Sequence, residues 1–74
     1  MATIDIDNRG LPPPEPMVRI LGALANAQQD DQIVALMDRE PFPLYSELER
    51  RGWDHANEED GETYRLTIFK AADA

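Results

Sequence analysis

The strongest constraint on the fold of this chain is the alternation of polar and apolar residues near its two ends. Ile4 and Ile6 alternate with polar neighbours across residues 3–7, and the same two-residue period recurs across residues 63–70. A strand with this period has one apolar face and one solvated face. Both segments are therefore predicted to be strands of a sheet that is covered on one face only.

The segments between these two strands predict two helices. Apolar residues recur with helical spacing across residues 17–24, so an amphipathic helix is predicted to follow a proline-rich start and to end near Gln28. Pro43 is predicted to open a second helix. The cations and the glycine at residues 50–52 are typical of its carboxyl end.

The remaining segments complete a βαβαββ order. The continuous apolar run at residues 33–37 predicts a central, well-covered strand. Residues 53–58 predict a further strand, Asp60 and Gly61 a hairpin turn, and residues 71–74 a frayed tail. Each helix connects two strands, which favours a parallel first pair. We predict a single domain over residues 1–74: an α/β (α+β) two-layer sandwich, with a four-stranded mixed sheet and two helices on one face.

Composition narrows the classes of partner. The chain has 74 residues, with fifteen acidic and seven basic side chains and a formal net charge of −8. Nonspecific nucleic-acid binding needs a basic surface, and anionic membranes also repel such a chain, so neither partner is expected. The acidity is interpreted as a source of solubility, with a basic partner protein as the alternative. No apolar run has the length of a membrane span or the pattern of a secretory signal, which predicts a cytoplasmic protein.

Few residues of this chain are suited to catalysis or metal binding. The sequence has no cysteine, one histidine (His55) and one serine (Ser46), and Ser46 lacks the glycines of a nucleophile elbow. The segment that begins at Asp5 superficially resembles the start of a calcium loop. Arg9 and Pro16 nevertheless occupy positions where that loop requires oxygen ligands. We therefore expect no catalytic residue, no metal ligand and no cofactor.

The most unusual feature is a proline segment at the start of the first predicted helix. It consists of Leu11, Pro12, Pro13, Pro14, Glu15, Pro16 and Met17. A helix N-terminus binds anions through free N–H groups, but proline has none, and the Glu15 carboxylate adds a negative charge there. The segment is interpreted as a rigid helix start rather than an anion site. It is also the candidate interaction surface.

Two further groups of residues have alternative interpretations. The acidic cluster Glu58, Glu59, Asp60 and Glu62 is typical of a solvated loop tip. The aromatic residues Phe42, Tyr45 and Trp53 either close the core around the second helix or form an exposed recognition patch. The first alternative is favoured because large aromatic side chains supply much of a small domain's burial.

The segment Gly10-Leu11-Pro12-Pro13-Pro14-Glu15-Pro16 resembles the signature of the TusA/SirA-like sulfur carriers. In that signature a Gly-Leu pair is followed, after one residue, by Cys-Pro-x-Pro at the start of the first helix. The signature's prolines match Pro14 and Pro16. Its cysteine, which carries the persulfide, falls on Pro13, so the resemblance does not transfer the functional residue.

The chain is also similar to the bacterial "domain of unknown function 2249" family over nearly its full length. The similarity rests on residues 9–16, on Pro43-Leu-Tyr45, and on Leu48, Arg51 and Gly52. It implies a TusA-like fold without the carrier thiol. It implies no established activity, and it suggests partner binding more than turnover.

These observations lead to a ranked set of functions. The leading prediction is a non-catalytic interaction module that binds an unidentified protein partner through the proline segment. The alternative is small-ligand or metal binding through Asp7, Asp38 and His55, if folding gathers them. A sulfur-relay component is the least favoured, because the thioethers of methionine cannot form a persulfide. The pathway and the oligomeric state stay open.

Overall fold

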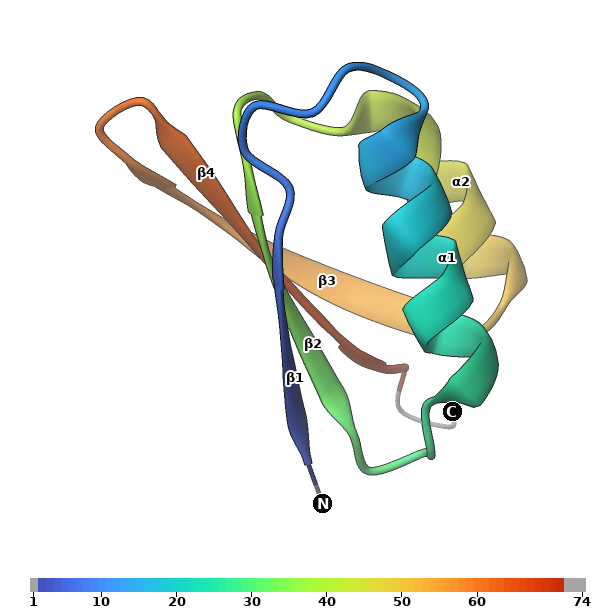
Figure 1. The fold of residues 1–74 in the computed structure, drawn as a ribbon. Coiled ribbons are helices and arrows are strands. Elements are labelled where there is room, and N and C mark those ends of the chain that lie inside the picture. The colour runs from blue at the N-terminus through green and yellow to red at the C-terminus, as the bar shows by residue number, and fades with distance from the viewer. Residues whose placement is uncertain (1, 72–74) are drawn as a thin grey trace.

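A computed structural model describes residues 2–71 and has the predicted βαβαββ order (Figure 1). The elements are β1 (Thr3–Asp7), α1 (Glu15–Asn26), β2 (Gln32–Met37), α2 (Phe42–Arg50), β3 (Trp53–Asp60) and β4 (Thr63–Lys70). Both helices lie on the same face of the sheet, and the other face is open. The predicted two-layer architecture is therefore confirmed. No helix within residues 2–71 is long and apolar enough to cross a membrane.

The sheet is mixed, with the strand order β1-β2-β4-β3. β1 and β2 run parallel, as predicted, and β4 is antiparallel to both of its neighbours. The core lies between the sheet and the helices because the apolar faces of all six elements point into this layer. Its buried apolar side chains are Ile6, Ile20, Leu24, Ile33, Ala35, Met37, Leu44, Leu48, Trp53, Leu66 and Ile68.

The strand β2 is central, as the apolar run at residues 33–37 predicted, but it is fully covered on only one face. Its alternate side chains from Ile33 to Met37 are buried beneath the helices. Val34 and Leu36 lie half-buried on the open face, in register with Thr67 and Arg65 of β4. A continuous apolar run therefore does not by itself show that both faces of a strand are covered.

Helix α1 ends at Asn26, slightly before the predicted end near Gln28. The cause is a local competitor for the backbone: the Asp31 carboxylate accepts a hydrogen bond from the Gln28 N–H at 2.9 Å. The Asp31 N–H in turn donates to the Gln28 carbonyl oxygen at 3.1 Å, which closes a turn. Aspartate often competes with helix formation in this way.

The hairpin turn lies one residue later than predicted. Asp60 belongs to β3 and is in register with Thr63, so Gly61 and Glu62 form the two-residue turn. Gly61 has a φ of 65°, and glycine is the residue preferred at the first central position of a type II′ turn. The expected Asp60–Gly61 turn was therefore wrong by one position, because Asp60 still pairs across the hairpin.

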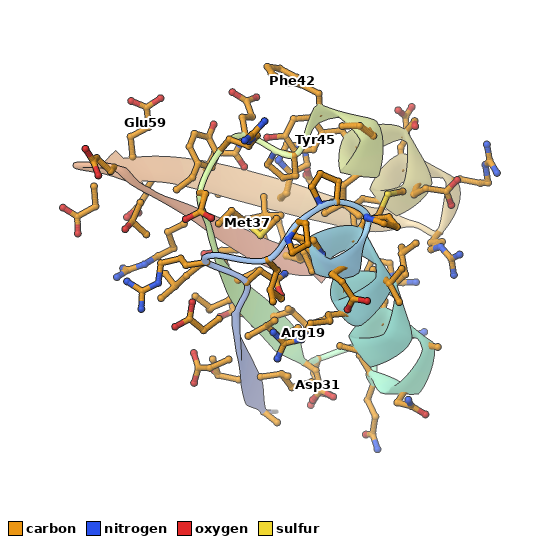
Figure 2. All side chains as sticks on the ribbon, turned by 45° about the horizontal axis from the view of Figure 1, so that its top comes forward. Arg19, Asp31, Met37, Phe42, Tyr45 and Glu59 are labelled. Atoms are coloured by element: carbon orange, nitrogen blue, oxygen red, sulfur yellow. The ribbon has the colours of Figure 1, made fainter. Side chains whose placement is uncertain are left out.

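The three aromatic residues around α2 do not share one environment. Trp53 is buried and Tyr45 is half-buried, whereas Phe42 is 68% exposed and points away from the body of the domain (Figure 2). The expectation that all three close the core is therefore wrong for Phe42. At the carboxyl end, the Ala71 N–H donates to the Gly52 carbonyl oxygen at 3.0 Å, so this residue of the predicted frayed tail is tied down. Residues 72–74 lie outside the described part of the chain.

Candidate functional site: a proline groove beside an acidic hollow

A groove of about 420 Å³ lies where β1 and β2 both end. Because the two strands are parallel, the segments that lead from them to α1 and α2 meet at one edge of the sheet (Figure 1). The first segment contributes Asn8, Leu11, Pro13, Pro14, Pro16 and Met17. The second contributes Met37, Asp38, Arg39, Glu40, Pro41, Pro43 and Leu44. We call this cavity the proline groove.

Hydrogen bonds tie the two walls of the proline groove together. The Asn8 N–H donates to the Leu36 carbonyl oxygen at 2.8 Å, which extends the pairing of the parallel strands. The Gly10 N–H donates to Asp38 Oδ2 at 2.6 Å. Gly10 has a φ of 80°, a conformation that glycine adopts without steric cost. The glycine therefore allows the first segment to turn toward the second.

Asn8 is the buried polar side chain of this site. It is 1% exposed, and its Nδ2 group donates to the Pro16 carbonyl oxygen at 3.1 Å and lies 3.4 Å from the Met37 sulfur. Its Oδ1 atom has no hydrogen-bond partner among residues 2–71. Asn8 is not among the site residues predicted from the sequence. The two-residue period of β1 nevertheless places position 8 on the same side as Ile4 and Ile6, and this signal could have found it.

The proline segment starts α1 without a side-chain cap. Pro14 is the N-cap residue, and no side chain bonds to the free N–H groups of the first turn. The Glu15 N–H, one of the few donors in the segment, is taken by the Pro12 carbonyl oxygen at 3.1 Å. Helix α2 begins in the same way, with Pro41 at its N-cap. These contacts agree with a rigid helix start, and they leave the groove apolar and poor in donors.

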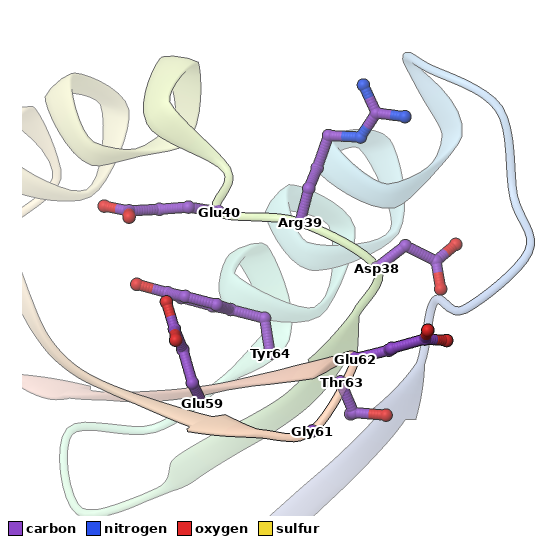
Figure 3. A pocket seen from close by; sticks show the side chains of 8 residues that line it. All are labelled: Asp38, Arg39, Glu40, Glu59, Gly61, Glu62, Thr63 and Tyr64. Carbon is purple, nitrogen blue, oxygen red and sulfur yellow. The ribbon is translucent and has the colours of Figure 1, made fainter.

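A second cavity, of about 570 Å³, adjoins the proline groove and is rich in carboxylates (Figure 3). We call it the acidic hollow; it is lined by Asp38, Arg39, Glu40, Glu59, Gly61, Glu62, Thr63 and Tyr64. Four carboxylates face one guanidinium among these residues. Residues 38–40 line both cavities, so the link between β2 and α2 forms the wall that the two share. The acidic cluster of the sequence thus contributes Glu59 and Glu62 to a cavity wall.

A hydrogen-bonded network fixes Glu40 in this shared wall. The Tyr45 hydroxyl donates to Glu40 Oε2 at 3.1 Å, and Asn57 Nδ2 donates to the hydroxyls of both Tyr45 and Tyr64. The His55 ring stacks on Tyr45 with a centroid distance of 4.2 Å, and its Nδ1 lies 3.1 Å from Asn57 Oδ1. Burial, and then the bond to Glu40, raises the pKa of the Tyr45 hydroxyl. This network could not be predicted from the sequence, because its members meet only when α2 packs on β3.

The three residues of the ligand-binding alternative occupy separate environments. Asp7 accepts hydrogen bonds from Arg9 at 2.9 and 2.8 Å, and these bonds lower the pKa of its carboxyl from 3.8 to about 2. Asp38 accepts the Gly10 N–H, and His55 belongs to the network around Tyr45. No group of three or more His, Asp or Glu side chains within the described range could hold a metal ion. The structure therefore does not bring the three residues together as a ligand set.

The fold of this domain is similar to that of a SirA-like protein of known structure. The crystal structure of a SirA-like protein from Desulfitobacterium hafniense matches it with a TM-score of 0.76 and 26% sequence identity. The match covers 97% of this chain and 100% of that one. The model of the family described as uncharacterized conserved protein (DUF2249) matches residues 5–70, and the chain belongs to this family. None of the curated proteins compared with the chain matches it.

Proposed function

We propose that this domain is a non-catalytic binding module of the cytoplasm that holds a partner protein through the proline groove. The observation that carries the proposal is the groove itself. Four residues of the segment that resembles the sulfur-carrier signature line an open, apolar cavity, and one of them, Pro13, occupies the position of the carrier cysteine. The recognition surface is thus retained while the reactive group is replaced.

The side chains around the groove suit binding better than turnover. None of the residues that line it is a cysteine, serine, histidine or lysine. Asp38 and Glu40, its carboxylates, are hydrogen-bonded to Gly10 and Tyr45. Five prolines and several apolar side chains make up most of the wall. Complete burial of one large apolar side chain from a partner contributes about 1.5–3 kcal/mol.

Sulfur transfer is the activity that would contradict a non-catalytic role. We expect the wild-type protein to gain no mass after incubation with a persulfide donor, because it offers no thiol. Pro13→Cys is the positive control. Pro13 is exposed at the groove, so the thiol of this variant should react and add sulfur mass. Added sulfur on the wild-type chain, measured by intact-mass spectrometry, would refute the proposal.

The binding role is tested by selection from a random-peptide phage library, with two matched variants. Leu11 lines the groove and does not belong to the buried core, so Leu11→Ser should remove groove surface and leave the fold intact. Val18 on α1 is 57% exposed and lies outside the groove, so Val18→Ser is the control. We expect peptides that bind the wild type and V18S but not L11S, with thermal melts confirming the fold. A selection without any such peptide would contradict the proposal.

A further inference from the structure

The proline groove and the acidic hollow form a continuous two-part surface. The groove supplies an apolar cavity, and the hollow supplies carboxylates directly across the shared wall of residues 38–40. Figure 3 shows Asp38 and Glu40 extending from this wall in opposite directions, with Glu59 and Glu62 across the hollow. A ligand that crosses the wall meets apolar surface on one side and negative charge on the other.

We propose that the partner is a basic protein segment, in which an apolar side chain enters the proline groove and a neighbouring lysine or arginine lies over the acidic hollow. This inference rests on the proposed function and adds the chemistry of the partner. The shared wall of residues 38–40 keeps the apolar contact and the charged contact close together. The apolar residue and the cation must be near neighbours in the bound segment, because the two cavities have residues in common.

The charges of the hollow are free to meet a cation. The side chains of Glu59 and Glu62 are exposed and form no hydrogen bond or ion pair with any residue from 2 to 71. Asp38 and Glu40 accept hydrogen bonds from uncharged donors, and neither forms an ion pair with any other described residue. Arg39 is the only cation among the lining residues, and it lines both cavities. The surface is therefore complementary to a basic ligand.

The same charges argue against a second copy of this chain as the occupant. Each copy carries a formal net charge of −8, so pairing through an acidic surface brings like charges together. A basic segment instead gains attraction at the hollow and speeds its own encounter with the surface. The occupant that fits the groove is thus a different, basic protein.

The first test is the composition of the groove-dependent peptides, meaning those that bind the wild type and V18S but not L11S. We expect them to combine an apolar residue with lysine or arginine close by. Groove-dependent peptides that are neutral or acidic would overturn the basic partner and leave the binding role intact. A selection that yields no groove-dependent peptide would overturn the binding role itself, so the two failures are distinguishable.

The second test removes charge from the hollow without changing its shape. Glu59→Gln and Glu62→Gln should each weaken the binding of a synthetic groove-dependent peptide about two- to fivefold, and added salt should reduce this difference. Glu49→Gln is the control. Glu49 is exposed on α2 and lines neither cavity, and its substitution removes one negative charge, as E59Q and E62Q do. Equal affinities for E59Q, E62Q and E49Q, measured by fluorescence anisotropy, would overturn the inference.

The third test reverses the sign of the expected effect. Arg39 opposes a basic ligand, so Arg39→Gln should tighten the binding of the same peptide about two- to fivefold. Weaker binding of R39Q would indicate an acidic ligand and overturn the proposal. Sedimentation equilibrium tests whether a second copy of the chain occupies the groove. If the wild type and V18S are dimers and L11S is a monomer, the groove binds a second copy and the proposal is overturned.

Discussion

The first turns of each helix accept a hydrogen bond from an asparagine side chain, and the two asparagines lie in different surroundings. Asn8, just after β1, donates to the Pro16 carbonyl oxygen in the first turn of α1. Asn57 of β3 donates to the hydroxyl of Tyr45 in the first turns of α2. Both side chains hold a proline-started helix that lacks a side-chain cap.

We call Asn8 the first anchor and Asn57 the second anchor. The two anchors differ in burial and in the number of hydrogen-bond partners. Asn8 is 1% exposed, and its Oδ1 atom has no partner within residues 2–71. Asn57 is half-buried, and both ends of its amide are engaged, by Tyr45, Tyr64 and His55. A buried polar group without a full set of partners is sensitive to any added charge, whereas a connected group near solvent tolerates change. The comparison predicts unequal responses to identical substitutions.

The largest effect is expected from Asn8→Asp. The substitution keeps the shape of the side chain but replaces the donor to Pro16 with an oxygen and introduces an unpaired charge in the core. An uncompensated buried charge costs about 3–5 kcal/mol. A buried carboxyl prefers its neutral form, so the loss of stability should be greater near neutral pH than in mild acid. Urea unfolding at several pH values measures it.

Asn57→Asp is the matched substitution at the second anchor. The side chain is half-buried, and the neighbouring His55 Nδ1 and the Tyr64 hydroxyl can donate to a carboxylate, so the loss should be about 1 kcal/mol. Equal losses for N8D and N57D in the same unfolding series would show that the two anchors do not differ as proposed.

A smaller effect is expected from Tyr45→Phe, which sharpens the account of the second anchor. The variant loses the bond to Glu40 and one acceptor of Asn57, at a cost of about 0.5–1.5 kcal/mol. Burial raises the pKa of Tyr45 above its ordinary value of 10.0, so the unfolded chain ionises first and wild-type stability falls as the pH rises above that value. The Y45F variant should not show this part of the loss of stability at alkaline pH.

Tyr64→Phe is the control for that prediction. The Tyr64 hydroxyl accepts one hydrogen bond from Asn57 at 3.1 Å. When this hydroxyl is removed, Asn57 keeps Tyr45 as a partner. Y64F should therefore be less destabilised than Y45F in urea unfolding at neutral pH. The reverse order would place Tyr64, rather than Tyr45, at the centre of the network.

The smallest effect concerns the exposed ion pair next to Asn8. The hydrogen bonds from Arg9 lower the pKa of Asp7 from 3.8 to about 2. The unfolded chain therefore takes up a proton first, so the contribution of Asp7 to stability is present above pH 3.8 and is lost as the pH falls through about 2. Asp7→Asn should flatten this part of the acid unfolding curve.

Asp5→Asn is the control for the acid unfolding experiment. Asp5 lies on the same strand and is exposed, and it forms no ion pair or hydrogen bond through its side chain within the described residues. The D5N substitution removes one negative charge, as D7N does, without removing an interaction. If D5N and D7N change the acid curve equally, the ion pair of Asp7 contributes nothing specific.

Much of the fold could be predicted from local patterns. The alternation at residues 3–7 and 63–70 predicted two strands, and the observed strands have the same bounds. The proline segment was predicted to be the start of the first helix, and five of its seven residues line the groove. The errors lie at element ends, where a single interaction decides the last residue. Asp60 pairs with Thr63 across the hairpin, and the Asp31 carboxylate binds the Gln28 N–H just after α1.

The sequence by itself determined the layer architecture, the absence of a thiol and the proline-rich start of the first helix, because periodicity and residue chemistry act over short spans of the chain. Only the tertiary structure decided which side chains meet. It buried Asn8 beneath Pro16, joined Tyr45 to Asn57, and brought Asp38 and Glu40 between an apolar groove and an acidic hollow. Such contacts join residues far apart in the chain, so their geometry exists only after the helices pack on the sheet.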